Sequence, residues 1–115
     1  MKSADEQRLD HILDYCCDIE DSLDRFGHDL ETFIADRDFY NSVSMSLLQI
    51  GELAKRISPE TMALTGEDIS WSAIKGMRDH FAHGYGEMDS EIIFMTATTD
   101  IPTFKKRLEE LRDSL

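Results

Sequence analysis

Apolar side chains recur every three or four residues along almost the whole of this 115-residue chain, and no stretch alternates cleanly with a period of two. A spacing of three and four places side chains on one face of an α-helix, whereas a half-buried strand needs strict alternation. The first stripe follows Ser3, which forms a capping-box pattern with Glu6, and ends at Gly27. Its members are Leu9, Ile12, Leu13, Cys16, Ile19, Leu23 and Phe26. The periodicity predicts an all-α fold.

A second helix is predicted to begin between Asp29 and Asp36 and to end before Ser58. Its inward-facing positions are Val43, Leu47, Ile50, Leu53, Ala54 and Ile57. Ser58 can cap a short turn with Pro59 as its first helical residue, because the N–H that proline lacks is not needed there.

A third helix is expected after a loop at residues 66–68. Ser70 is its predicted N-cap, and its apolar positions are Trp71, Ile74, Met77 and Phe81. The glycines Gly84 and Gly86 predict that this helix loosens at its end.

The last apolar stripe continues on both sides of a proline. Its members are Ile93, Ala97, Ile101, Phe104, Leu108, Leu111 and Leu115. Pro102 removes one helical hydrogen bond and clashes with the preceding turn, yet the spacing does not change across it. The pattern therefore predicts one kinked helix rather than two separate ones. Four helices with short connections indicate an antiparallel four-helix bundle, and the length suits one domain over residues 1–115.

The chain is strongly acidic: 24 acidic and 12 basic residues give a formal net charge of −12. This charge excludes broad, non-specific coating of nucleic acid or of an anionic membrane, but it permits a local basic cleft or a basic partner protein. The adjacent Cys16 and Cys17 point about 100° apart on a helix, so they form neither a disulfide nor a redox pair. With no long apolar run and no signal-peptide pattern, we expect a cytoplasmic protein without membrane contact.

Most titratable residues are expected on solvated surfaces. The polar side of the first helix carries Asp10, Asp14, Asp18 and Asp21, for which a solvated acidic stripe is favoured over a metal site. His11 and His28 stand alone. The sequence holds no glycine-rich phosphate loop, no HExxH pair and no zinc-ligand spacing, so we expect neither a metal site nor a cofactor.

One segment differs from the rest. Residues 75–86 hold an arginine, two histidines, a carboxylate and a tyrosine among glycines. A guanidinium binds phosphate and stabilises developing charge, and an imidazole transfers protons near neutral pH. RNA supplies its own nucleophile, the ribose 2′-hydroxyl. These residue types therefore suit a metal-free cleavage of RNA.

The spacing within this segment leaves two interpretations open. Arg78 and His83 are five positions apart, about 140° around a helix axis, so they share a cleft only if the helix frays at Gly84. Asp79 and His83 are four apart and can touch directly. The alternative is a helix C-terminus whose histidine and arginine oppose the helix dipole, with Tyr85 as a packing residue. The residue types alone favour the two equally.

Four segments, in order along the chain, carry a resemblance to a known family. Residues 50–58 (IGELAKRIS) lie on the second helix, and residues 69–78 lead into the pattern Arg-x4-His-x-Tyr at residues 78–85. The triplet Asp100-Ile101-Pro102 and a leucine-rich tail follow. This ordered set resembles the HepT-like toxins of the HEPN superfamily, which are encoded beside minimal nucleotidyltransferase (MNT) antitoxins.

The resemblance implies a homodimeric HEPN-type bundle with the motif helices of both subunits at the interface. It implies a metal-independent endoribonuclease, the toxin of a toxin–antitoxin pair that an MNT-type nucleotidyltransferase neutralises. Arg78 then contacts the phosphate, His83 is the acid and base, and Asp79 fills the polar position after the arginine, where asparagine is commoner. Tyr85 matches the tyrosine that the partner can modify with AMP, whereas His80 has no counterpart and is expected on the helix surface.

A second function fits the same residues. The chain could be a non-catalytic helical subunit that binds a nucleotidyltransferase, with the motif as its docking or modification site. The acidic net charge favours this alternative, and the intact pair of Arg78 and His83 favours the ribonuclease.

Overall fold

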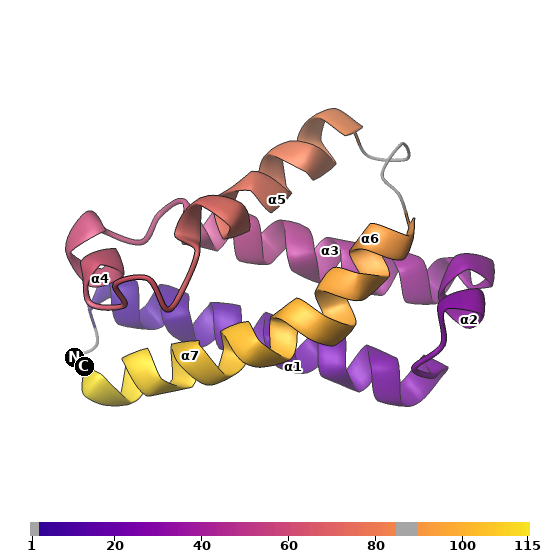
Figure 1. The fold of residues 1–115 in the computed structure, drawn as a ribbon, viewed down its shortest axis with the longest axis horizontal. Coiled ribbons are helices and arrows are strands. Elements are labelled where there is room, and N and C mark those ends of the chain that lie inside the picture. The colour runs from indigo at the N-terminus through magenta and orange to yellow at the C-terminus, as the bar shows by residue number, and fades with distance from the viewer. Residues whose placement is uncertain (1–2, 85–89) are drawn as a thin grey trace.

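The computed structural model describes the backbone of residues 3–84 and 90–115, and the side chains of these residues apart from 80–84. Within this part every regular element is a helix (Figure 1). The long helices are α1 (Ala4–Phe26), α3 (Arg37–Ala54), α5 (Trp71–Gly84) and α7 (Ile101–Ser114); the short ones are α2 (Leu30–Ala35), α4 (Pro59–Ala63), α6 (Ser90–Met95) and the π-helical turn η1 (Thr96–Asp100). The predicted all-α class is confirmed.

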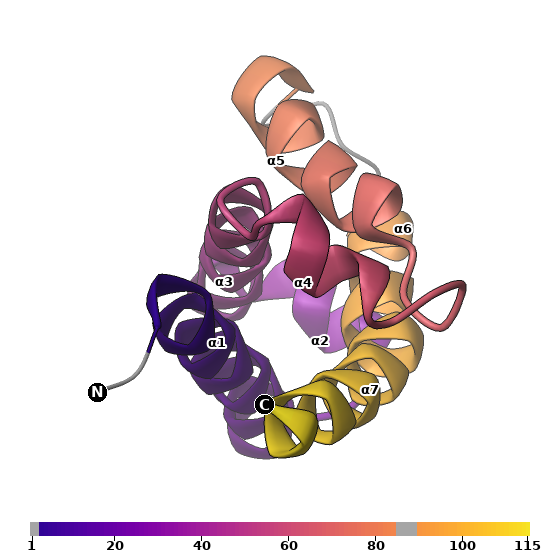
Figure 2. The same ribbon diagram turned by 90° about the vertical axis from the view of Figure 1, so that its left-hand side faces the viewer.

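Successive long helices run in opposite directions around one core (Figure 1). Helix α1 packs against α3 and α7, and α3 also supports α5. The beginning of α1 and the end of α7 lie at the same end of the bundle. Helix α5 lies at the edge and rises away from the other helices toward its C-terminal end (Figure 2).

The predicted apolar stripes form this core. The buried residues that they contribute are Leu9, Ile12, Cys16, Ile19, Leu23, Val43, Leu47, Ile50, Ala54, Ile57, Trp71, Ile93, Ala97, Ile101, Phe104, Leu108 and Leu111. Phe33 on α2 is fully buried although it belongs to no predicted stripe, and its ring contacts those of Phe39, Tyr40 and Phe94. A six-residue helix is too short to show its own periodicity, so the apolar spacing does not predict this aromatic cluster.

The ends of the first helices follow the predicted local chemistry. The Ser3 side chain accepts the N–H of Glu6 at 3.1 Å, and Gly27 ends α1 with a φ of 113°. The second predicted helix proves to be two, because Asp29 caps α2 and Asp36 caps α3. The predicted start between these two aspartates therefore marks two helix starts rather than one.

Helix α3 ends at Ala54, three residues before the predicted boundary. The N–H groups of Arg56 and Ile57 bond to the carbonyls three residues earlier, which tightens the chain into turns. Ile57 stays buried in this turn. The apolar spacing that includes Ile57 therefore predicted a helix that is too long. The predicted cap of the next element is confirmed, since the Ser58 hydroxyl accepts the Thr61 N–H and Pro59 opens α4.

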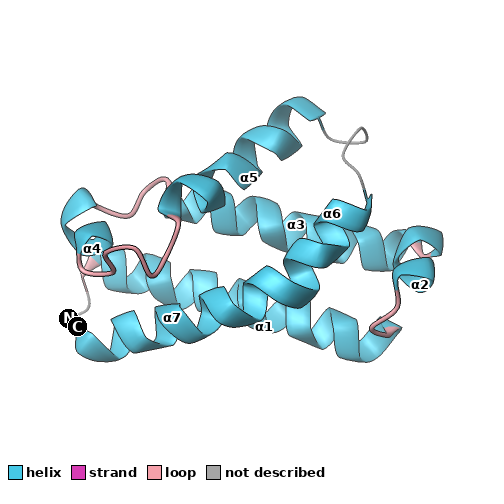
Figure 3. Cartoon of the chain, in the orientation of Figure 1, coloured by secondary structure: helices cyan, strands magenta, loops and turns pink. Residues whose placement is uncertain are grey.

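The kinked last helix is also confirmed. Elements α6, η1 and α7 follow one another without a loop (Figure 3), and the π-helical turn lies just before Pro102. A π-helical turn shifts hydrogen bonds to carbonyls five residues back and so absorbs the N–H that proline lacks. The Thr96 and Thr98 hydroxyls donate to the carbonyls of Ile92 and Phe94, a contact that bends helices.

Helix α5 reaches Gly84, the last residue that the structure describes before residue 90. The predicted loosening at Gly84 and Gly86 concerns the chain beyond this point, which lies outside the described residues, and it stays a prediction.

The acidic stripe of α1 corrects another prediction in part. Asp14, Asp18 and Asp21 are exposed, as expected, but the Asp10 carboxylate accepts the Nε–H of Arg112 at 2.8 Å. This ion pair joins α1 to α7.

Asp5 joins the beginning of α1 to the cap of α4. Its carboxylate accepts the hydroxyl and N–H of Ser58 and, at 2.6 Å, the hydroxyl of Thr61. Partial burial raises the pKa of Asp5, but the hydrogen bonds from Ser58 and Thr61 and the charge of Arg8 outweigh that effect. The pKa therefore lies below its ordinary value.

We expect Asp5→Ala to lower the free energy of unfolding at pH 7 by about 1–3 kcal/mol, because the Ser58 and Thr61 hydroxyls lose their acceptor. Since folding lowers the pKa, the carboxylate stabilises the fold above its ordinary value of 3.8, and this contribution is lost as the pH falls through the folded value. Urea unfolding should show a smaller difference from wild type at pH 3 than at pH 7.

Asp14→Ala is the matched control, because Asp14 is exposed on the same helix. It should change the free energy of unfolding by less than about 0.5 kcal/mol at either pH. A deficit of Asp5→Ala that is equally large at both pH values would contradict the role of the ionised carboxylate.

Candidate active site

The Arg78 side chain on α5 lies between two carboxylates. Its Nε–H donates to Oε1 of Glu52 on α3 at 2.5 Å, and Nη1 donates to Oδ1 of Asp79 at 3.2 Å. About a third of the Arg78 side chain remains exposed, at 32%. A guanidinium held at a helix junction and still open to solvent is a group that can bind a phosphate oxygen.

These contacts occupy only part of the guanidinium, which has five N–H donors. Glu52 accepts a hydrogen bond from Nε, and Asp79 accepts one from Nη1. Within the described part of the chain, no carboxylate pairs with Nη2. The Nη2 amino group can therefore donate to a ligand while both ion pairs persist.

The two carboxylates also fix the charge state of this group. The hydrogen bond from Arg78 to Glu52, followed by that to Asp79, raises the pKa of Arg78 above its already high ordinary value. Arg78 is therefore charged at neutral pH. Any dependence of activity on pH near neutrality must therefore come from another group.

Gly51 sets the distance between α3 and α5 at this point. It is buried, and a Cβ atom placed on it would lie 2.8 Å from the backbone N of Arg78 and 2.9 Å from the Arg78 Cβ. Real Cβ atoms essentially never approach other atoms so closely. Only glycine lets the α5 backbone come this near to α3, and the next residue along α3 is Glu52, which binds Arg78.

The other predicted site residues are placed less completely. His83 lies on α5 five positions after Arg78, and because the helix is continuous there, the two positions are about 140° apart around its axis. The His80 and His83 side chains and all of Tyr85 lie outside the described residues. The predicted contact between Asp79 and the His83 ring also lies outside the described residues. Asp79 does contact Arg78.

Glu52 is the residue that sequence reasoning missed. The family resemblance includes Glu52 only as one position of the segment 50–58 and assigns it no function. The adjacent Gly51 was the available signal, because a glycine inside a helical stripe often marks a close backbone approach. That signal does not reveal which helix approaches.

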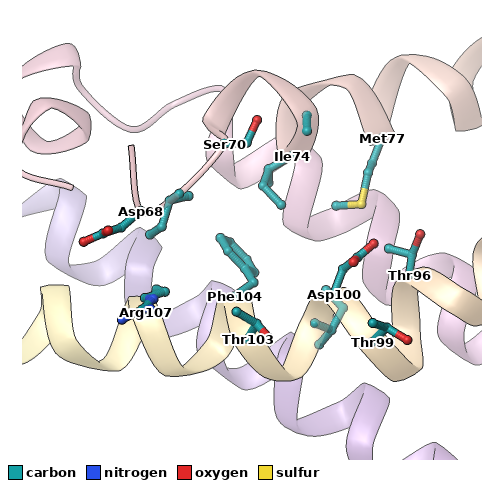
Figure 4. Close-up of a pocket in the computed structure, with 13 residues that line it drawn as sticks. Asp68, Ser70, Ile74, Met77, Thr96, Thr99, Asp100, Thr103, Phe104 and Arg107 are labelled. Carbon is teal, nitrogen blue, oxygen red and sulfur yellow. The ribbon is translucent and has the colours of Figure 1, made fainter. Parts of the chain in front are cut away.

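A cleft of about 560 Å³ lies on a different side of α5, between it and η1 and α7 (Figure 4). Ile74, Met77 and Phe104 form its apolar wall, and Asp100 and Arg107 lie at its edges. Arg78 and Glu52 do not line it. The cleft is therefore separate from the phosphate-binding candidate.

Among the described residues, no group of three or more His, Cys, Asp and Glu side chains could hold a metal ion. None of the helices there combines the length and the apolar character needed to cross a bilayer.

A family model described as "Ribonuclease HepT-like" matches residues 12–111, which is most of the chain. The chain belongs to the HepT-like ribonuclease family. It is 31% identical over 104 residues to "Probable ribonuclease HepT" of Thermococcus cleftensis, covering 86% of this chain and 94% of the relative. It is 32% identical over 104 residues to "Putative RNase TTE0752" of Caldanaerobacter subterraneus, covering 90% and 89%. No solved structure matches the chain.

These matches confirm the family that the ordered segments indicated. They also confirm the enzyme class at the level of the family, which is one of ribonucleases. The match spans α3 and α5 together, and so it contains the junction at which Gly51, Glu52 and Arg78 meet.

In this HepT-like chain we expect Gly51→Ala to lower the free energy of unfolding by about 1–3 kcal/mol, since the new methyl group overlaps the α5 backbone. Gly76→Ala is the matched control, because a Cβ on Gly76 meets nothing within 4 Å. Gly76→Ala should stabilise the protein by up to about 1 kcal/mol through helix propensity. Urea unfolding measures both; equal effects of the two variants would contradict the close approach at Gly51.

Proposed function

We propose that this chain is a metal-independent endoribonuclease in which Arg78 binds the scissile phosphate and His83 transfers protons. The observation that supports this most directly is the Arg78 guanidinium, which Glu52 and Asp79 hold through Nε and Nη1, while no carboxylate of the described residues pairs with Nη2. Membership of a ribonuclease family supplies the class of reaction. The resemblance of residues 78–85 to Arg-x4-His-x-Tyr supplies the role of His83.

The reaction that these groups support is transesterification within RNA. The 2′-hydroxyl oxygen attacks the adjacent phosphorus while the imidazole of His83 accepts its proton. The bond from phosphorus to the 5′-oxygen breaks, and that oxygen takes up a proton to leave as a hydroxyl. Arg78 stabilises the charge that develops on the phosphoryl oxygens. The products are a 2′,3′-cyclic phosphate and a 5′-hydroxyl, and no metal ion enters the balance.

A homodimer supplies the second proton-transfer group. Arg78 and His83 lie about 140° apart on one helix, so a single helix does not turn both positions to one ligand. A two-fold interface between α5 segments brings two arginines and two histidines into one cleft. His83 of the partner subunit can then give a proton to the 5′-oxygen while the first His83 takes one.

The biological role in this proposal is that of a toxin. Its cognate MNT-type nucleotidyltransferase is the antitoxin and transfers AMP to Tyr85. The phosphate of the modified tyrosine can pair with Arg78 as a substrate phosphate would, and its negative charge repels an incoming RNA backbone. The rival function, a non-catalytic partner of a nucleotidyltransferase, is favoured by the net charge of −12.

Purified wild-type protein should cleave RNA in the presence of EDTA, and Arg78→Ala and His83→Ala should each lower the cleavage rate by about 100-fold or more. Lys75→Ala, which removes another positive charge from α5, and His80→Ala, which removes another imidazole, are the matched controls and should keep most of the activity. Light scattering must show the same dimer for each variant. Unchanged cleavage by His83→Ala would contradict the role of His83, and wild-type protein that does not cleave RNA would favour the non-catalytic function.

Co-expression with the cognate nucleotidyltransferase should add one AMP to the protein and abolish cleavage. Tyr85→Phe should remain toxic in its presence, because phenylalanine has no hydroxyl to accept AMP. Tyr15→Phe is the control, since Tyr15 is half-buried on α1 and should still allow neutralisation. Intact-mass spectra without an adduct in a fully neutralised protein would show that complex formation alone silences it.

A further inference from the structure

Glu52 takes part in none of the chemical steps proposed above, yet it makes the shorter of the two contacts with Arg78. We propose that Glu52 is a positioning residue, which binds Arg78 through Nε and thereby turns the Nη2 amino group toward the RNA phosphate. This inference rests on the proposed function.

The two carboxylates around Arg78 are not equivalent. Asp79 is the next residue on α5 and 61% exposed, so it moves with Arg78 and cannot fix it relative to the rest of the bundle. Glu52 lies 26 residues away in sequence on α3, the helix packed against α1 in the core. Among the described residues, Glu52 alone ties the guanidinium to a different element.

The backbone at this junction is built to permit that contact. Gly51 lets α5 approach until a Cβ at position 51 would overlap the Arg78 backbone. The short approach sets the Arg78 Cα beside α3 and leaves Nε within 2.5 Å of Glu52. An arginine side chain loses rotamer entropy when it is fixed, so holding Nε in advance lowers the entropy cost of ordering Arg78 when RNA binds.

Because Glu52 is negatively charged, its orientation of Arg78 can be distinguished by experiment from an electrostatic attraction of RNA. A carboxylate next to a phosphate-binding arginine repels a polyanion, so Glu52 weakens the initial binding of RNA. Its benefit must come from the orientation of Arg78 in the transition state, where a positioned donor acts most strongly. Removing Glu52 should therefore lower kcat without raising KM.

The variants Glu52→Gln and Glu52→Ala separate orientation from charge. The amide oxygen of Glu52→Gln still accepts the Nε–H, so this variant should keep most of kcat and show a lower KM for RNA. Glu52→Ala should lose about tenfold or more in kcat, again without a higher KM. Glu67→Gln removes the same charge from an exposed loop and is the matched control. Thermal unfolding of each variant reports whether the fold is intact.

The Nε–H signal of Arg78 in a ¹⁵N NMR spectrum tests the contact without any activity. Arg78→Lys assigns the signal by its disappearance, and hydrogen bonding to Glu52 should slow its exchange with water. We expect slow exchange in wild type and Glu52→Gln, and fast exchange in Glu52→Ala. Equal exchange rates in all three would overturn the anchoring of Nε by Glu52.

The kinetic and spectroscopic results distinguish the failure of each proposal. Wild-type protein that does not cleave RNA overturns the proposed function, whatever the NMR spectrum shows. Cleavage by wild type with an unchanged kcat in Glu52→Ala overturns the positioning role. Equal losses of kcat in Glu52→Gln and Glu52→Ala overturn it as well, because the charge of Glu52 would then be what matters.

Discussion

The contact between α3 and α5 at Gly51 determines where the candidate site lies. Helix α5 is at the edge of the bundle, and of its described apolar residues only Trp71 is buried, while Ile74 and Met77 are half-buried. Its apolar face is therefore a weak guide to its position. The absence of a side chain on Gly51 lets the α5 backbone approach α3 closely. That approach places Arg78 beside Glu52 rather than in open solvent.

Across the cleft from α5 lies a second local feature on which the fold depends, the π-helical turn before Pro102. It allows one helical run to change direction between α6 and α7 without a loop, so that Ile93, Ala97 and Ile101 all stay buried. The same turn presents Thr96 and Thr99 to the cleft beneath α5. Proline prevents the regular hydrogen bond at this point. A straight α-helix therefore could not bury these three residues and also present the two threonines to the cleft.

The sequence predicted the features that depend on local chemistry. Ser3 and Ser58 cap helices as expected, and the stripe across Pro102 correctly indicated one bent helix. The sequence did not predict the features of the fold that depend on which helices contact each other. The Glu52–Arg78 pair joins residues 26 positions apart, and no periodicity links them. Phe33 was missed for a related reason, since its six-residue helix is defined by the core into which it packs.

The distribution of charge explains how so acidic a chain can hold an anion-binding group. Part of its negative charge is used within the fold: Asp10 and Glu6 pair with Arg112, and Glu20 pairs with Lys105, which joins α1 to α7. At Arg78 the same kind of pairing has a different consequence. Glu52 and Asp79 together outnumber the single positive charge, so the pair of carboxylates with Arg78 carries a net charge of −1. These three groups give no net attraction for a polyanion, so in the proposed ribonuclease we expect recognition of RNA at Arg78 to depend on the geometry of short hydrogen bonds.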